Sequence, residues 1–304
     1  MEKNIVTKKY IGQNDRFADL CNYYLFDGRQ VIRPEDLKEK DVTELGALFT
    51  AKGLATVERI RDVLKTCAIK TAEGVTYLII GVENQSDVHY AMVIRNMVQD
   101  ALNYAAQVEK LAKEHKMRKD LTGDEFLSGI SKEDKLAPVI TITVYWNSGG
   151  WDAPRTLHEM LGEENEEILR YVPDYRMNLI VPEEIRDFEK FKTELGAVLE
   201  FLRRSGDVGE TKEFIKMNQE HGLYFSRDAV EVLNACVNAG LSLEDAEGGE
   251  GNVCKGIQGW LEEERAEERV SVFLELVKDG LLDLSEAAKR ANKTKEEFEK
   301  LLNN

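Results

Sequence analysis

The chain has 304 residues, of which 42% are hydrophobic and 32% are charged, and its formal net charge is −16. This length is enough for one large domain with an appendage or for two modest domains, and no stretch approaches the roughly 20 consecutive apolar residues that span a bilayer. The acidic balance argues against a protein that coats DNA through a generally basic surface, although a local basic patch can still bind nucleic acid.

The first residues of the chain and its cysteines predict that the protein is not exported. The first residues, MEKNIVTKKY, contain lysines but no apolar segment of the kind found in a secretory signal. We therefore expect a cytoplasmic protein with no membrane partner. The cysteines are scattered and form no CxxC pair, so neither a zinc site nor a disulfide framework is expected.

The first predicted element is a helix over residues 13–26, QNDRFADLCNYYLF, where apolar side chains recur at helical spacing. Asn14 or Asp15 stands where an N-cap belongs. Residues 35–50 are mixed in character and only weakly helical.

The next two segments predict a β-hairpin. Residues 58–70 become β-branched and alternating from Asp62 onward, and VTYLIIGVENQ, residues 75–85, is the strongest strand pattern in the chain. A polar break at residues 71–74 separates the two strands and indicates a turn. We expect the two strands to pair in an antiparallel manner.

A long helix is predicted over residues 88–113. Its apolar face is marked by Val93, Ile94, Met97, Val98, Ala101, Ala105 and Val108. Five basic residues follow at its end: Lys110, Lys113, Lys116, Arg118 and Lys119. Two interpretations remain open, a DNA-binding patch and a solvated helix end whose cations suit the helix dipole.

The remaining elements complete a mixed α/β pattern. Residues 121–135 are predicted as a loop, while 138–146 and 177–182 are predicted as strands. We expect a mixed α/β domain over residues 1–182 and an acidic helical C-terminal region over residues 183–304. The last helices, within 271–302, fit either a helix-turn-helix or a helical hairpin that docks or dimerises.

The hairpin brings two carboxylates together if its register has no bulge. With Lys70 facing Val75, Asp62 faces Glu83, at a Cβ separation of roughly 4.5–5.5 Å. Gln85 lies two residues beyond Glu83 and points to the same face of the sheet.

Two opposed carboxylates repel each other unless they lie in water, share a proton or hold a cation. Mg²⁺ prefers oxygen ligands and is often held by one or two carboxylates together with water and substrate phosphate. Gln85 can add an amide oxygen or orient a water molecule. The group suits metal-assisted hydrolysis of a phosphodiester, whereas solvated strand ends are the plainer alternative.

The order of these motifs resembles the PD-(D/E)xK nuclease superfamily and, within it, the transposase-like, recombination-promoting nuclease (Rpn) family. The similar segments are Asp62 with Glu83-Asn84-Gln85, the helix NDRFADLCNYYLF, the segment GVENQSDVHYAMVIRNMVQDALNY and the segment PVITITVYWNSGGWDAPRTLHEML. Typical members have an apolar residue where this chain has Asn84.

The resemblance implies a restriction-endonuclease-like fold and DNA cleavage that depends on Mg²⁺ or Mn²⁺. Asp62 and Glu83 would be the metal ligands, and Gln85 would occupy the position where many nucleases have a lysine. Asp15 matches an aspartate of the opening helix, as an auxiliary ligand or simply as an N-cap. Arg95 matches a helix arginine that could meet the carboxylates or a phosphate.

Two classes of function follow. The first is a divalent-metal DNA endonuclease that acts in DNA recombination, whose C-terminal region serves dimerisation or regulation, and we expect a homodimer. The second is a catalytically inactive member of the same fold that binds nucleic acid or a protein through residues 110–119 and the C-terminal helices. A glycosidase-like hydrolase with paired carboxylates is a third, weaker match.

Overall fold

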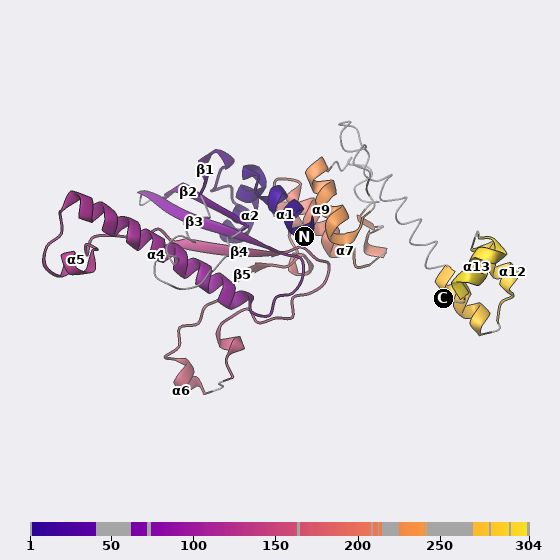
Figure 1. The fold of residues 1–304 in the computed structure, drawn as a ribbon. Helices are drawn as coiled ribbons and strands as arrows, with labels where there is room; N and C mark the ends of the chain where they lie inside the picture. Colours follow the sequence, from indigo (N-terminus) through magenta and orange to yellow (C-terminus); the bar gives the residue numbers. More distant parts are fainter. Residues whose placement is uncertain are drawn as a thin grey trace. The chain divides into compact units, whose positions relative to one another are not determined.

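The computed structural model describes residues 2–40, 62–71, 74–162, 165–207, 209–211, 213–214, 225–239, 241, 270–279, 281–291 and 293–302 (Figure 1). The chain forms two compact units. The first contains residues 1–206 and 231–237, and the second contains 207–230 and 238–304. The predicted domain boundary after residue 182 stays a prediction.

A five-stranded mixed sheet is the centre of the first unit. Its strands, in spatial order, are β1 (Leu37–Glu39), β2 (Val63–Thr71), β3 (Gly74–Gln85), β4 (Val139–Tyr145) and β5 (Asn178–Ile180). The first three strands pair in an antiparallel manner, and β3, β4 and β5 are parallel. This sheet confirms the predicted mixed α/β fold, although β1 lies where only weak helical character was expected.

The β2–β3 hairpin has the predicted register. Lys70 pairs with Val75, and Val63 pairs with Val82, with no bulge in the ladder between them. The ladder extends to Thr71 and Gly74, so each strand is one residue longer at this end than predicted. A continuous ladder matters because a slip of one residue would move every side chain to the other face.

The first unit also contains helices, some of which flank this sheet. They are α1 (Glu2–Ile11), α2 (Asn14–Phe26), α4 (Met92–Arg118), α5 (Gly123–Ser128), α6 (Glu166–Leu169) and α7 (Leu195–Arg204). Short 3-10 turns lie at Pro34–Asp36, His158–Met160, Pro182–Glu184 and Phe188–Lys190. None of the described helices is long and apolar enough to cross a membrane.

Two expectations about helices were wrong. The N-cap of α2 is Gln13, so Asn14 and Asp15 occupy the first two helical positions rather than the cap. The side chain of Asn14 instead donates to the carbonyl of Pro34 at 3.0 Å. The predicted loop over residues 121–135 contains α5, whose C-cap is Gly129 in a left-handed conformation with φ of 75°.

The two faces of the sheet contact different helices. Lys65 on β2 reaches the start of α2, where its Nζ donates to the carbonyl of Gly12 at 2.6 Å. Glu83 on β3 points to the other face and contacts α4. On that face Leu64, Ile79 and Val139 form an apolar cluster, which packs against Leu102 and Ala106 of α4.

The C-terminal half of α4 extends past the sheet and forms an arm with the segment that returns from it (residues 107–137; Figure 1). The side chain of Gln107 binds the backbone of Ala137 twice, at 2.7 and 3.1 Å. Gly129 lies so close to Ala112 that an added Cβ would approach the Cβ of Ala112 to 3.2 Å. The return segment is therefore held against α4 at several points.

His115 fastens the arm through two carboxylates. Its Nδ1 lies 2.8 Å from Asp120, and its Nε2 lies 2.9 Å from Asp134. Both ring nitrogens can donate only in the protonated imidazole. The hydrogen bond with Asp120 is the main cause of a raised pKa for His115, which ordinarily titrates near 6.5.

We expect this fastening to weaken as the pH rises. Because the folded pKa of His115 lies above 6.5, its contribution to stability is complete below pH 6.5 and is lost as the pH rises through the folded pKa. NMR titration of His115 and hydrogen exchange of residues 129–135 would measure both effects. His115→Gln should remove the part of the pH dependence that exceeds that of intrinsic amide exchange. A His115 pKa at or below the ordinary value would contradict the prediction.

The described part of the second unit is helical, which confirms the predicted helical character of the C-terminal region. It includes α12 (Leu284–Arg290) and α13 (Lys295–Leu302), and α9 (Arg227–Val237) has residues in both units. A small apolar cluster joins Val270, Ala287, Ala288 and Phe298. The α12 helix begins with a side-chain cap, in which Asp283 accepts from the backbone N–H of Ser285 at 2.8 Å.

Candidate functional site

The structure brings Asp62 and Glu83 together. Asp62 directly precedes β2, next to the pair formed by Val63 and Val82. Its backbone N–H donates to Oε1 of Glu83 at 3.3 Å, while its own Oδ2 accepts from the backbone N–H of Asn84 at 2.8 Å. Asp62 and Glu83 therefore lie next to each other at the end of the hairpin, one position beyond the last pair of the ladder.

Glu83 is fully buried, and α4 supplies its partners. Arg95 donates from Nη2 to Oε2 of Glu83 at 2.9 Å, and Gln99 donates from Nε2 to Oε1 at 3.1 Å. Arg95 and Gln99 lie four residues apart on one face of the helix. A buried carboxylate requires such partners, and the positive charge of Arg95 also offsets the repulsion between Glu83 and Asp62.

A layer of buried polar side chains continues from Glu83 between α4 and the sheet. Asn96 donates to Thr143 at 2.9 Å, and Asp100 accepts from Thr141 at 2.5 Å and from Tyr175 at 2.6 Å. Sequence reasoning missed this layer. The spacing of four polar residues in the long helix could have indicated it, because they lie on one face: Asn96, Gln99, Asp100 and Asn103.

Several atoms of this layer have no hydrogen-bond partner within the described part of the chain. They are Nε of Arg95 and the amide oxygens of Asn96, Gln99 and Asn103, all of them buried. Buried polar atoms are normally satisfied by protein or by ordered water. An amide oxygen is a hard ligand of the type that Mg²⁺ accepts, and that of Gln99 belongs to a side chain that contacts Glu83.

Gln85 ends β3 on the same face as Glu83, with a side chain that is mostly buried. Its carbonyl accepts from the backbone N–H of Trp146 at 2.8 Å. Glu83 and Gln85 pair with Thr143 and Tyr145 of β4, so both lie toward the C-terminal ends of parallel strands. Open α/β sheets commonly bind ligands at this edge.

Asn84 points to the opposite face and connects Asp62 with β4. Its Oδ1 accepts from Nε1 of the fully buried Trp146 at 2.7 Å, and its Nδ2 lies 3.4 Å from Oδ2 of Asp62. The amide therefore satisfies a buried indole N–H and helps to hold Asp62. These two contacts explain how a polar side chain is accommodated at this buried position.

We expect Asn84→Ala to lower the free energy of unfolding by about 1–3 kcal/mol, because it leaves the indole N–H of Trp146 buried without an acceptor. Urea denaturation would measure the loss. Trp146→Phe provides the control, since in that background the same alanine substitution should cost clearly less. Equal costs in both backgrounds would show that the hydrogen bond contributes nothing.

Asp15 lies apart from the contacts of Glu83. It is exposed in the first turn of α2, and its charge acts on Lys65, which faces α2 on the opposite side of the sheet. Lys65 is 1% exposed, donates to Oδ1 of Asn14 at 2.5 Å, and has a pKa lowered mainly by burial. The structure thus groups Asp15 with this buried lysine, which sequence reasoning did not single out.

The basic residues at the end of α4 are all exposed. They are Lys110, Lys113, Lys116, Arg118 and Lys119. Two of them pair with acids on the same helix, Lys113 with Glu109 at 2.8 Å and Arg118 with Glu114 at 3.4 Å. Fifteen residues separate Arg95 from Lys110, about 22 Å along the helix, so the residues predicted to contact DNA form two separate groups.

Within the described ranges, no group of three or more histidine, cysteine, aspartate or glutamate side chains could hold a metal ion. A Mg²⁺ site does not need three, because water and substrate phosphate complete its coordination. Asp62, Glu83 and the unpartnered amide oxygen of Gln99 are all oxygen donors, and their chemistry fits such an ion.

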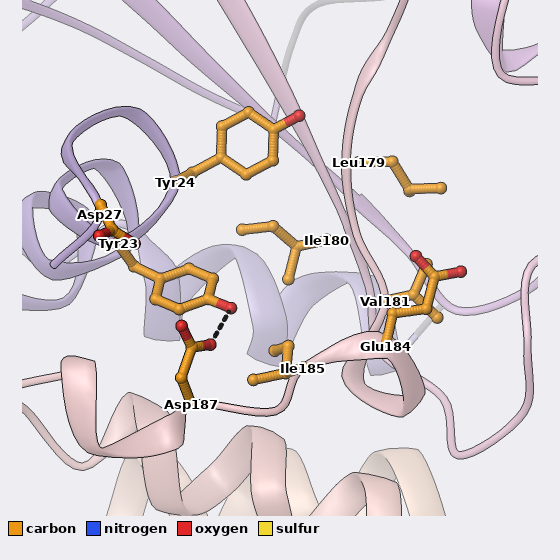
Figure 2. A pocket seen from close by; sticks show the side chains of 9 residues that line it. All are labelled: Tyr23, Tyr24, Asp27, Leu179, Ile180, Val181, Glu184, Ile185 and Asp187. Atoms are coloured by element: carbon orange, nitrogen blue, oxygen red, sulfur yellow. Dashed lines mark hydrogen bonds between the residues drawn. The ribbon is translucent and has the colours of Figure 1, made fainter.

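A pocket of about 240 Å³ lies between α2 and the β5 edge, and none of the predicted site residues lines it (Figure 2). Its carboxylates already have partners. Tyr23 donates to Asp187 at 2.9 Å, Lys190 contacts both Asp27 and Asp187, and Arg155 pairs with Glu184. The pocket is smaller than most ligand sites, which occupy about 300–1,000 Å³, and we assign no ligand to it.

Comparison with known proteins places the site within a family. A search of curated proteins and a search of solved structures found no match. The family model described as "Putative transposase, YhgA-like" matches residues 57–223, a range that contains Asp62, Glu83, Gln85 and Arg95. This match covers more than half of the chain and agrees with the transposase-like resemblance of the motifs. The chain is therefore a member of the YhgA-like transposase family.

Proposed function

We propose that the protein is a DNA endonuclease that hydrolyses phosphodiester bonds with the help of Mg²⁺ or Mn²⁺. The observation that carries the proposal is the position of Asp62 beside Glu83 at the end of the β2–β3 hairpin, with Gln85 on the same face. Membership of a transposase-like family supports a reaction on DNA.

Each residue of the site has a definite task in this proposal. Asp62 and Glu83 hold the ion, which when bound would lower the pKa of a water molecule and neutralise charge on the phosphate. Gln85 orients the attacking water through its amide. Arg95, which is 22% exposed at its side chain and contacts Glu83, offers a second positive charge to a phosphate oxygen.

A second candidate function is a binding protein of the same fold without catalysis. The contacts of Glu83 favour it, because Arg95, Gln99 and the backbone of Asp62 already satisfy its carboxylate without a metal ion. In this case the exposed basic residues at the end of α4 would bind nucleic acid or an acidic partner.

Plasmid DNA distinguishes the two candidates. The wild-type protein should nick or linearise plasmid in Mg²⁺ or Mn²⁺ and should leave it intact in chelator, and titration calorimetry should detect binding of the metal alone. Cleavage that persists in chelator would contradict the metal mechanism. Retention of DNA without cleavage, combined with no heat of metal binding, would support the second candidate.

A further inference from the structure

The outward face of α4 is unusual for a surface helix. The face on the sheet carries buried polar side chains beside the apolar Leu102 and Ala106, whereas the outward face carries an apolar stripe. Its residues are Ile94, Val98, Ala101, Ala105 and Val108. Val98 is 37% exposed and Val108 is 39% exposed. A surface helix normally turns its apolar stripe inward and its charged residues outward, so this stripe lacks the burial that its composition favours.

The spacing of the stripe is that of a helix-pairing seam. Its five residues follow one another at intervals of four, three, four and three, which is the heptad pattern of packed helices. In an antiparallel pair centred on Ala101, the outer residues Ile94 and Val108 meet each other, because each lies seven residues from Ala101. A self-complementary surface of this kind fits a two-fold interface.

We propose that α4 pairs in an antiparallel manner with α4 of a second copy of this chain, about a two-fold axis near Ala101. Ile94 would then pack near the partner's Val108. The small side chains of Ala101 and Ala105 allow the two helices to approach closely at the centre. This inference does not depend on the proposed nuclease activity.

Charge along α4 selects the antiparallel arrangement. The C-terminal end of the helix is basic, with exposed Lys110 and Lys116, whereas the segments next to its N-terminal end expose Asp87 and Asp152. Tyr90 donates to Asp152 at 3.1 Å and holds that carboxylate near the start of α4. Antiparallel pairing brings the basic end of one copy beside the acidic end of the other, and it also aligns the helix dipoles favourably.

Such pairing would bear directly on the candidate site. Arg95 and Gln99, which bind Glu83, lie on the same helix as the seam, so a partner that packs against α4 would restrain both residues. The two copies of Arg95 would be separated by about 18 Å along the helix pair, since each lies six residues from the axis.

Sedimentation or light scattering on the full chain tests the pairing. Wild type should have the mass of two chains, and Ala101→Glu should have the mass of one, with an unchanged circular dichroism spectrum because Ala101 is exposed. Tyr77→Glu is the matched control: Tyr77 is 67% exposed on β3, and its replacement should leave the dimer intact. A monomeric wild type, or a dimeric Ala101→Glu, would overturn the proposal.

Cysteine cross-linking tests the direction of the pairing. In a Cys254→Ser background the other three cysteines are buried, so an added surface cysteine would dominate oxidation. Ala101→Cys should form a disulfide-linked dimer by itself. Ile94→Cys should cross-link when mixed with Val108→Cys but not alone. Cross-linking of Ile94→Cys to itself would show a parallel pair and overturn the antiparallel arrangement.

Discussion

Replacement of Glu83 by glutamine should reduce metal-dependent DNA cleavage by at least about 10²-fold, the effect of removing one electrostatic group from an active site. Glutamine keeps the size of the side chain but removes the negative charge that would hold the ion. It also turns one acceptor into a donor, which then faces Arg95 or Gln99. Plasmid cleavage at saturating Mg²⁺ and calorimetric titration with Mg²⁺ would measure the two losses.

The control for this experiment is another glutamate of the same unit. Glu133 is exposed in the return segment of the arm, and Glu133→Gln should cleave like wild type. Circular dichroism must show that Glu83→Gln is folded, because the substitution leaves Arg95 without its carboxylate. A folded Glu83→Gln that binds Mg²⁺ and cleaves as well as wild type would remove Glu83 from the site.

The hairpin could be predicted from the sequence because its determinants are local. Two strongly β-forming segments flank a short polar break, and the ladder then follows from the chain itself. The position of Asp62 beside Glu83 was predictable for this reason. The hydrogen bonds of Asn84 were not, because its indole partner, Trp146, lies 62 residues away in sequence, directly after β4.

The orientation of α4 could not be predicted from its periodicity. Periodicity identifies an apolar stripe but does not say what the stripe packs against, and the usual rule would turn it toward the sheet. Here the sheet side is polar because Thr141, Thr143 and Glu83 present polar groups on that face. Only the pairing of β3 with β4 brings these side chains under the helix, and that pairing is non-local.

Arg95 should be the residue of the site that contributes most to stability. Arg95→Met should lower the free energy of unfolding by about 3 kcal/mol, because it leaves the fully buried Glu83 without the cation of Arg95. This value is the lower end of the range for breaking a buried ion pair, since Arg95 itself is partly exposed. Chemical denaturation would measure the loss. The double variant Arg95→Met with Glu83→Gln should lose less than the sum of the two single variants, since it leaves no unpaired charge.

Metal binding should then become visible as a gain in stability. In Arg95→Met the Glu83 carboxylate lacks its cation, so Mg²⁺ should raise the melting temperature of this variant more than that of wild type. The double variant should show no such gain. Arg155→Met, which breaks an ion pair whose side chains are 37% and 48% exposed, should cost only about 0–1 kcal/mol. Two results would contradict this prediction. The first is that Arg95→Met lowers the free energy of unfolding no more than Arg155→Met does. The second is that Mg²⁺ raises the melting temperature of the double variant as much as that of Arg95→Met. Either result would show that Glu83 is not the carboxylate that couples Arg95 to the ion.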